Sequence, residues 1–358
     1  MAFQHSLRSK QSLILDGGFG QLIADEYPEL DIADDGLWAA GVAIRSPEII
    51  RQIHLRYLDA GADIITTATY QASVDGYIGS GLAINEDDAV SLMTKTISLA
   101  IDARNAYMQK SNMSCANPSS VTSSACHLRQ PLIAVSLGSI GATLGNCSEY
   151  TGAFGHELMP SDIKEFHQRR LSVLLKCLQK PYLQNQIDIL AFETIPSLVE
   201  VDGIVSALEH VHAVRASDIK LPPAWISFTT RTVDQLGSGE PLHVAAKTAS
   251  SSPYVHAIGI NCMPTDIAAE LVLVLKGITI KPIVCYPNGQ AWQGSAEHWQ
   301  DKSKQVLPEC FANTAISWVQ HGAAVVGGCC RTSPEHTRAL ATTVQDYVRR
   351  NNIIDMFI

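Results

Sequence analysis

The fold can be inferred from the segment HGAAVVGGCCRTSP, residues 321–334. Gly322 is typical of the residue that ends a helix, and the four apolar residues after it are typical of a buried parallel strand. Ser333 and Pro334 are typical of an N-cap and the first position of a new helix. The segment therefore predicts a helix, a strand, a loop and a second helix in succession. A similar helix–glycine–strand joint occurs at Gly61, in AGADII, residues 60–65.

This alternation of short apolar runs and longer amphipathic segments continues along the chain. We expect eight strands near residues 13–15, 64–67, 132–137, 187–192, 225–228, 257–260, 283–286 and 323–326. We expect helices near residues 47–60, 86–108, 161–178, 197–214, 241–249, 264–275, 303–321 and 334–350. The strands are apolar throughout rather than alternating, as in parallel sheets that helices cover on both faces.

Eight strand–helix units predict an α/β fold, a (βα)8 barrel of the TIM type, with residues 1–358 as a single domain. A doubly wound open sheet is the alternative. One stretch breaks the alternation: residues 110–130 are rich in Ser, Asn, Thr and Pro, and we expect a flexible surface insertion there.

Composition excludes several classes of function. The 358 residues include 26 Lys and Arg against 35 Asp and Glu, a net charge of −9, and aromatic residues make up only 6%. An acidic chain without a basic stripe is a poor nucleic-acid binder, because affinity for phosphates depends on positive charge. No apolar stretch approaches the roughly 20 residues of a membrane span, and no signal peptide is evident. We therefore expect a cytoplasmic protein whose nine cysteines are reduced.

The most informative chemistry lies in three cysteines. Cys329 and Cys330 follow two glycines at the end of the eighth predicted strand, and Cys262 follows the sixth. In a closed barrel these strand ends face the same side, where active sites are built. Three thiolates suit Zn²⁺ and leave its fourth position open, as in a catalytic site. Two alternatives remain at this point: ordinary core cysteines, or a disulfide between Cys329 and Cys330.

Other polar residues and glycines also occur at predicted strand ends. They are Asp16, Gly17, Gly18, Thr67, Glu193 and Asn261. Carboxylates can pair with an ammonium group, and glycines allow close backbone approach to a carboxylate. Together these residues predict a site for an amino acid, although each alone is equally typical of a helix cap or a turn.

Four segments resemble the signature segments of the homocysteine S-methyltransferases. They are LDGGFG at 15–20, FETIP at 192–196, GINC at 259–262 and GGCCR at 327–331, and the likeness runs from about residue 13 to 340. The resemblance implies that Cys262, Cys329 and Cys330 hold Zn²⁺, and that the sulfur of L-homocysteine takes the fourth position.

The resemblance also suggests substrate roles for the polar strand ends. Glu193 and Asp16 would bind the amino group of homocysteine, while Thr67, Gly17 and Gly18 would hold its backbone. Asn261 would support the metal loop. By the same analogy Trp38 would lie near a cationic methyl donor, where a cation–π contact is favourable. Packing of the loop onto the barrel is an equally good explanation of Trp38.

The family branch sets the expected methyl donor. YQAS at 70–73 and SGEP at 238–241 resemble the S-methylmethionine-dependent branch. We expect transfer of a methyl group from this sulfonium, with S-adenosylmethionine as a second donor, to homocysteine, giving methionine. A betaine-dependent enzyme is the alternative within the class, and a non-catalytic zinc or thiol redox switch is the alternative outside it.

Overall fold

The computed structural model describes residues 2–9, 12–32, 35–115, 129–154, 158–214, 221–290 and 305–351. Its centre is an eight-stranded, wholly parallel sheet in the order β1-β8-β7-β6-β5-β4-β3-β2. The strands are β1 (Leu13–Ile14), β2 (Ile64–Thr66), β3 (Leu132–Gly138), β4 (Ile189–Ile195), β5 (Ala224–Phe228), β6 (Val255–Asn261), β7 (Ile283–Tyr286) and β8 (Ala323–Val326). All eight predicted strands are confirmed.

The sheet closes on itself between its first two strands. Leu15 bridges Ile64 in parallel, the backbone N–H of Asp63 donates to the carbonyl of Ile14, and the Asp63 carboxylate accepts from the N–H of Ile14. The predicted barrel is therefore confirmed. The open-sheet alternative is excluded because β1 pairs with β8 and also meets β2.

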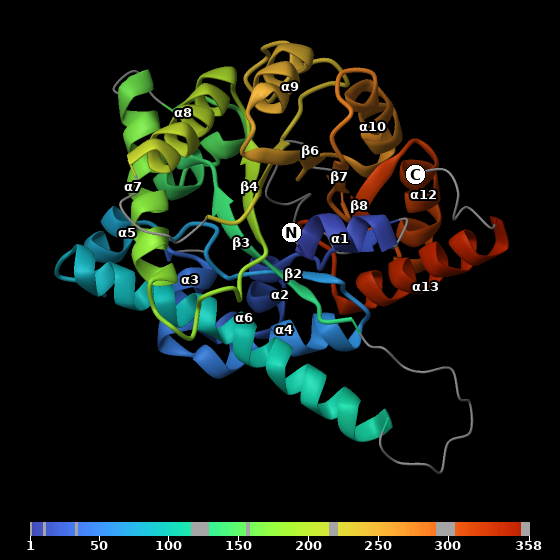
Figure 1. Cartoon of the computed structure of the whole chain (residues 1–358), viewed down its shortest axis with the longest axis horizontal. Coiled ribbons are helices and arrows are strands. Elements are labelled where there is room, and N and C mark those ends of the chain that lie inside the picture. Colours follow the sequence, from blue (N-terminus) through green and yellow to red (C-terminus); the bar gives the residue numbers. More distant parts are fainter. Residues whose placement is uncertain are drawn as a thin grey trace.

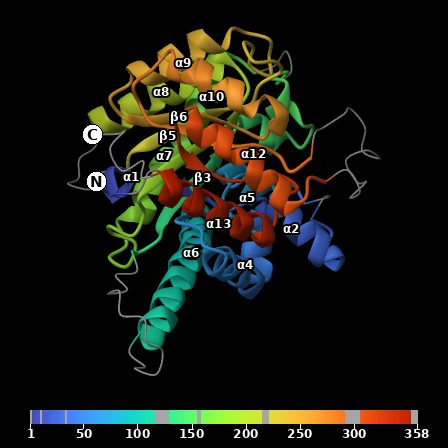
Figure 2. The same cartoon turned by 90° about the vertical axis from the view of Figure 1, so that its right-hand side faces the viewer.

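Helices surround the strands (Figure 1). The predicted ones are α4 (Pro47–Asp59), α6 (Glu86–Cys115), α7 (Pro160–Leu178), α8 (Leu198–Val214), α9 (Leu242–Ser251), α10 (Ala268–Lys276), α12 (Pro308–Gln320) and α13 (Pro334–Asn351). Figure 2 shows α6 extending well beyond the barrel. Because α6 continues to Cys115, residues 110–115 of the expected insertion are helical; residues 116–128 lie outside the described part of the chain.

Four short helices were not expected from the sequence. They are α1 (Ala2–Ser9), α2 (Phe19–Glu26), α3 (Ala39–Arg45) and α5 (Val74–Gly79). Each has at most eight residues, too few for a helical period to stand out, and tertiary packing rather than propensity supports such helices. In α3, five consecutive residues from Ala39 to Ala43 are buried, which gives no amphipathic pattern.

The apolar core has two layers. An outer layer between the sheet and the helices includes Ile65, Val135 and Leu190, and an inner layer inside the barrel includes Leu13, Ile64 and Val284. Helix α1 lies across the strands (Figure 1), and its Phe3 joins the inner layer 6.2 Å from the ring of Trp225. With side chains filling its interior, the barrel provides a rigid support for the loops at the strand ends.

A substitution at Gly322 tests whether the joint between helix and strand requires glycine. Its φ is +101°, a backbone conformation that favours glycine, and Gly61 at the equivalent joint has φ +102°. We expect Gly322→Ala to lower the free energy of unfolding by about 1–2 kcal/mol. Urea denaturation followed by circular dichroism measures this effect. Gly79→Ala, at the end of a helix and with open space around its Cα, is the matched control. Equal effects of the two substitutions would contradict the claim that the backbone conformation at residue 322 favours glycine.

Candidate functional site

The three cysteines converge at one end of the barrel. Their Sγ atoms all lie within 4.8 Å of one another, and those of Cys262 and Cys330 are 3.5 Å apart. Cys262 is buried and the other two are partly buried, and all three thiols are free. The predicted convergence is confirmed, and the disulfide between Cys329 and Cys330 does not form. Cys262 follows β6, and Cys329 and Cys330 follow β8; these two strands flank β7 in the sheet (Figure 1).

An unusual backbone conformation places Cys262. It directly follows β6 and has φ +54°, in the left-handed region that residues with a side chain rarely occupy. Its N–H still donates to the carbonyl of Tyr286 at the end of β7 (3.3 Å). Strain of this kind persists only where the surroundings hold it, and it is often found at functional sites.

The loop that carries Cys329 and Cys330 is held by backbone hydrogen bonds on both sides. Gly328 donates to the carbonyl of Asp16, and Cys329 donates to the carbonyl of Pro287 (3.1 and 2.9 Å). The carbonyl of Cys330 accepts from the N–H of Gly289 (2.8 Å). The loops after β1 and β7 thus fix the adjacent cysteines, and a Cβ on Gly328 would lie 2.3 Å from the Thr332 hydroxyl, so only glycine fits there.

Asn261, the residue before Cys262, connects the end of β6 to the ends of the neighbouring strands. Its Oδ1 accepts from the backbone N–H of Thr194 and from the Ser227 hydroxyl, both at 2.8 Å. Its Nδ2 donates to Thr194 Oγ1 (2.8 Å) and lies 3.9 Å from the sulfur of Cys329. Thr194, like Cys262, has a left-handed backbone, with φ +59°. Asn261 therefore ties the strained end of β4 to the strained end of β6.

Two buried carboxylates belong to the same end of the barrel. Glu193 accepts hydrogen bonds from the hydroxyls of Ser136 and Tyr286, and burial raises its pKa to about 7. Asp16 accepts from the backbone N–H and the hydroxyl of Thr66 (2.7 and 3.1 Å), and burial raises its pKa well above its usual value. An entering ammonium group would stabilise the charged form of both carboxylates.

The other residues singled out from the sequence have visible structural roles. Gly18 packs so close to the cysteine loop that a Cβ there would lie 2.5 Å from the carbonyl of Cys329, and a Cβ on Gly17 would lie 2.7 Å from the Thr332 hydroxyl. The Thr67 hydroxyl pairs with that of Thr69 (2.6 Å).

Trp38 is partly buried on the loop before α3. Its indole lies against α2, where a Cβ on Gly20 would overlap its ring nitrogen. The ring therefore packs the loop onto α2. Its role toward a methyl donor stays a prediction.

Tyr150 is a site residue that the sequence analysis missed. It ends the short turn η4 (Ser148–Tyr150), which follows β3 and the turn η3 (Ile140–Leu144). Its hydroxyl lies 3.4 Å from the sulfur of Cys262 and 4.0 Å from that of Cys330. The available signal was a polar and aromatic cluster, SEYTG at 148–152, after a predicted strand.

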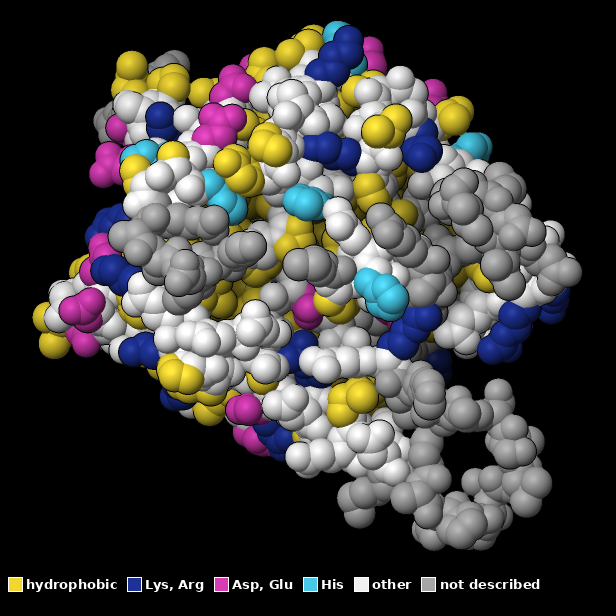
Figure 3. Space-filling model, viewed as in Figure 1, with side chains coloured by type: hydrophobic (Ala, Val, Ile, Leu, Met, Phe, Trp, Pro, Cys, Tyr) yellow, Lys and Arg dark blue, Asp and Glu magenta, His cyan; other side chains and the backbone are white. Residues whose placement is uncertain are grey.

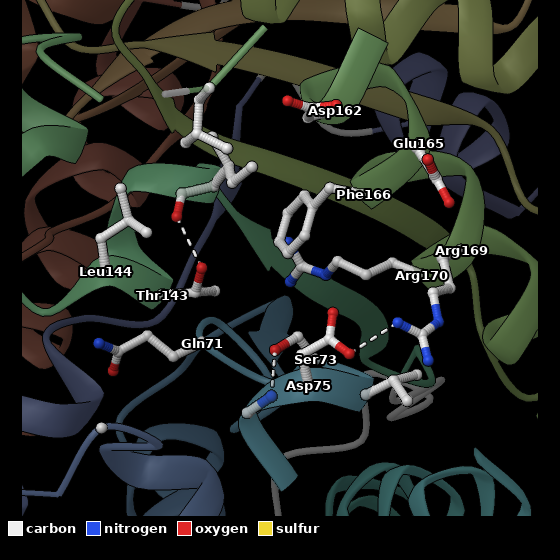
Figure 4. A pocket seen from close by; sticks show the side chains of 15 residues that line it. Gln71, Ser73, Asp75, Thr143, Leu144, Asp162, Glu165, Phe166, Arg169 and Arg170 are labelled. Carbon is white, nitrogen blue, oxygen red and sulfur yellow. Dashed lines mark hydrogen bonds and ion pairs between the residues drawn. The ribbon is translucent and has the colours of Figure 1, made fainter. Parts of the chain in front are cut away.

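A separate cavity of about 470 Å³ lies between the loops after β2 and β3 and the start of α7 (Figure 4). Gln71, Ser73, Phe166 and Arg170 are among the residues that line it. None of the site residues predicted from the sequence is among its lining residues.

The distribution of charged side chains on the surface agrees with the sequence, which has no basic stripe. On the face in Figure 3, basic and acidic side chains are interspersed over the described residues rather than gathered by sign. Among the helices of the described ranges, none combines the length and the apolar character needed to cross a membrane.

The fold and the site define the class: a (βα)8 barrel whose strand ends bring together two buried carboxylates and three free thiols with a spacing that could hold a metal ion. Comparisons with known proteins then identify the family. The sequence pattern of homocysteine S-methyltransferase matches residues 13–344, and the chain belongs to this family of methyltransferases.

Named relatives agree with this assignment. Homocysteine S-methyltransferase 1 of Brassica oleracea var. italica is 35% identical over 336 residues, covering 92% of each chain. Selenocysteine methyltransferase of Astragalus bisulcatus is 34% identical, over 92% of this chain and 91% of its own. The metallated form of homocysteine methyltransferase MmuM from Escherichia coli superposes with a TM-score of 0.73 and 30% identity, covering 96% of this chain and 99% of its own.

The cysteine cluster predicts a change that metal analysis can detect. In Cys262→Ala, we expect bound metal to fall from about one ion per chain to nearly none, while the circular dichroism spectrum stays native. The two layers of the core are built from apolar side chains of the strands and helices, so we expect the fold to persist without the metal. Cys310→Ala, at an exposed free thiol, is the control and should keep its metal. Full metal content in Cys262→Ala would rule out this donor set.

Proposed function

We propose that the protein transfers a methyl group from a sulfonium donor, S-methylmethionine, to the thiolate of L-homocysteine at a zinc centre, producing methionine. The observation that carries the proposal is the meeting of three free thiols with two buried carboxylates at one end of the barrel. A simple metal store needs only the thiols. A site for an amino-acid thiol also needs groups for the ammonium, and the carboxylates supply them.

The donor set fits zinc. Two thiolates bound tetrahedrally to Zn²⁺ at about 2.3 Å each lie about 3.8 Å apart. The sulfurs of Cys262 and Cys330 are 3.5 Å apart, and all three sulfurs lie within 4.8 Å of one another. Three thiolates leave a fourth position for the homocysteine sulfur. When bound, Zn²⁺ keeps that sulfur anionic at neutral pH, and the thiolate is the nucleophilic form.

The residues of the chain then bind and orient the reactants. Glu193 and Asp16 hold the ammonium of homocysteine, which sets the distance from that group to the cysteine cluster. Asn261 holds the loops of Thr194 and Cys262 in their strained conformations, so the site is preorganised before the substrate enters. Methyl transfer from a sulfonium needs no general base, because the acceptor is already a thiolate and the departing thioether is neutral. Orientation and proximity supply much of the remaining rate.

Sequence favours S-methylmethionine over betaine as donor, through YQAS at 70–73 and SGEP at 238–241. In the structure, Glu240 accepts hydrogen bonds from the backbone N–H of Leu198 and from the Ser238 hydroxyl (2.7 and 2.8 Å). The second segment therefore fixes the start of α8 rather than contacting the cysteines. The choice of S-methylmethionine over betaine rests on family likeness, because both donors are cationic and the negative charge of the site does not distinguish them.

A donor panel tests the proposed reaction. Purified protein loaded with Zn²⁺ is given homocysteine with S-methylmethionine, S-adenosylmethionine or betaine, and methionine is measured by mass spectrometry. We expect the highest kcat/KM with S-methylmethionine. Highest turnover with betaine would overturn the donor assignment. Absence of turnover with every donor, at full zinc content, would favour the redox-switch alternative instead.

The raised pKa of Glu193 predicts a pH dependence of amino-acid binding. Below its pKa of about 7 the carboxyl is protonated and neutral, so affinity for an ammonium should rise as the pH rises through 7. Methionine is the suitable probe, because its thioether does not titrate. We expect it to bind about tenfold more tightly at pH 8 than at pH 6, as measured by calorimetry.

Variants separate this effect from other titrating groups. Glu193→Gln should lose most of the pH dependence and bind methionine weakly throughout, and Asp16, whose pKa burial also raises, accounts for any remaining slope. Glu165→Gln, on the exposed face of α7, should behave as the unaltered protein does. An unchanged profile in Glu193→Gln would show that another group binds the ammonium.

A further inference from the structure

The turn η4 brings a second polar residue next to the cysteine cluster. Tyr150 contacts the sulfurs of Cys262 and Cys330 through its hydroxyl. The preceding residues hold the turn in place, because the Ser148 hydroxyl donates to the carbonyl of Gly141 (3.4 Å). Between Ser148 and Tyr150 lies Glu149, to which the sequence analysis and the proposed reaction assign no role.

The Glu149 carboxylate lacks a partner on one side. Its Oε2 is buried and has no hydrogen-bond partner, and within the described residues no Lys, Arg or His forms an ion pair with it. Burial raises the pKa of this carboxyl. A buried acceptor without a partner costs about 1–3 kcal/mol, and more when it is charged. Within the described residues, Oε2 of an ionised Glu149 is therefore free to accept a hydrogen bond from a positive group on a ligand.

Electrostatic interactions connect Glu149 to the residues of the site. Its charge raises the pKa of the buried Tyr70, secondary to the effect of burial, and Cys262 and Cys329 act on the same phenol. Its charge also interacts with Cys330. Tyr150 makes the direct contacts with the sulfurs, whereas Glu149 acts on Cys330 through space.

Each positive group of the two reactants can be matched to a carboxylate that would bind it. Glu193 and Asp16, which hydrogen-bond to Tyr286 and Thr66 respectively, account for the ammonium of homocysteine. An amino-acid sulfonium donor has two positive groups. Its sulfonium has to lie next to the acceptor sulfur, since it carries the methyl that is transferred, and its ammonium lies several bonds away. A carboxylate that acts on the cysteine cluster from a distance matches the second group.

We propose that Glu149 binds the ammonium group of the methyl donor, and so selects an amino-acid sulfonium over donors that lack an amino group. The inference rests on the proposed function, because it assumes a sulfonium donor. It adds a residue from the turn after β3 that recognises the donor, in addition to those that hold the acceptor.

Kinetics with two donors test the proposal. The donors are S-methylmethionine and dimethylsulfoniobutanoate, which keeps the sulfonium and the carboxylate but has no amino group; the second is measured as a substrate or as a competitive inhibitor. In Glu149→Gln we expect the KM for S-methylmethionine to rise about tenfold or more. The KM or inhibition constant for dimethylsulfoniobutanoate should change less than about twofold.

Two further measurements and a second variant serve as controls for a general loss of structure or activity. Zinc content and the KM for homocysteine should remain unchanged in Glu149→Gln, which also reports that the variant is folded. Glu165→Gln should leave all constants unchanged.

Each other outcome overturns the inference. Equal losses with both donors would mean that Glu149 acts on the sulfonium, and a raised KM for homocysteine would assign it to the acceptor. Unchanged constants for S-methylmethionine would remove Glu149 from the site while leaving the proposed function intact. If the unaltered protein uses no sulfonium donor, the proposed function fails, and the inference fails with it.

Discussion

The site depends on one geometric constraint: the carboxyl ends of parallel strands in a closed barrel face the same side. This constraint brings Cys262 to Cys329 and Cys330 across a long separation in sequence, because β6 and β8 flank β7 in the sheet. The local backbone completes the approach. Cys262 has a left-handed conformation, Gly328 before the adjacent cysteines packs too closely against Thr332 for a side chain, and the three sulfurs converge.

The strain at this point is balanced by the surrounding polar network. Thr194 and Cys262, with φ +59° and +54°, both adjoin Asn261, which uses both ends of its amide in hydrogen bonds. Such conformations cost about 1–2 kcal/mol each. A barrel with a filled interior resists relaxation, so the cost can be borne in return for a site that is formed before substrate arrives. The same rigidity keeps the carboxylates of Glu193 and Asp16 buried.

Charge gives the site its selectivity for the reactants. Three thiols, two buried carboxylates and the partly buried Glu149 lie at one end of the barrel. Burial raises the pKa of each of these carboxyls, so each is stabilised in its charged form by a positive ligand. In the proposed reaction, the acceptor amino acid supplies one positive group and a sulfonium donor supplies two more. Among the three carboxylates, Glu149 is the one with a buried oxygen that has no hydrogen-bond partner within the described residues.

The sequence by itself determined the eight strands, most of the surrounding helices and the cysteines of the cluster. These features follow from local signals, namely continuous apolar runs, glycines that end helices, and a rare pair of adjacent cysteines after two glycines. The tertiary structure alone decided the rest. Helices α2 and α3 are too short to have a readable period, and α6 continues past the point where its apolar pattern ends. Tyr150 and Glu149 come from the turn after β3, and only the closure of the barrel carries that turn to the sulfurs of Cys262 and Cys330, which follow β6 and β8. Contacts between residues distant in the chain leave no periodic trace in the sequence, because they depend on how whole elements pack.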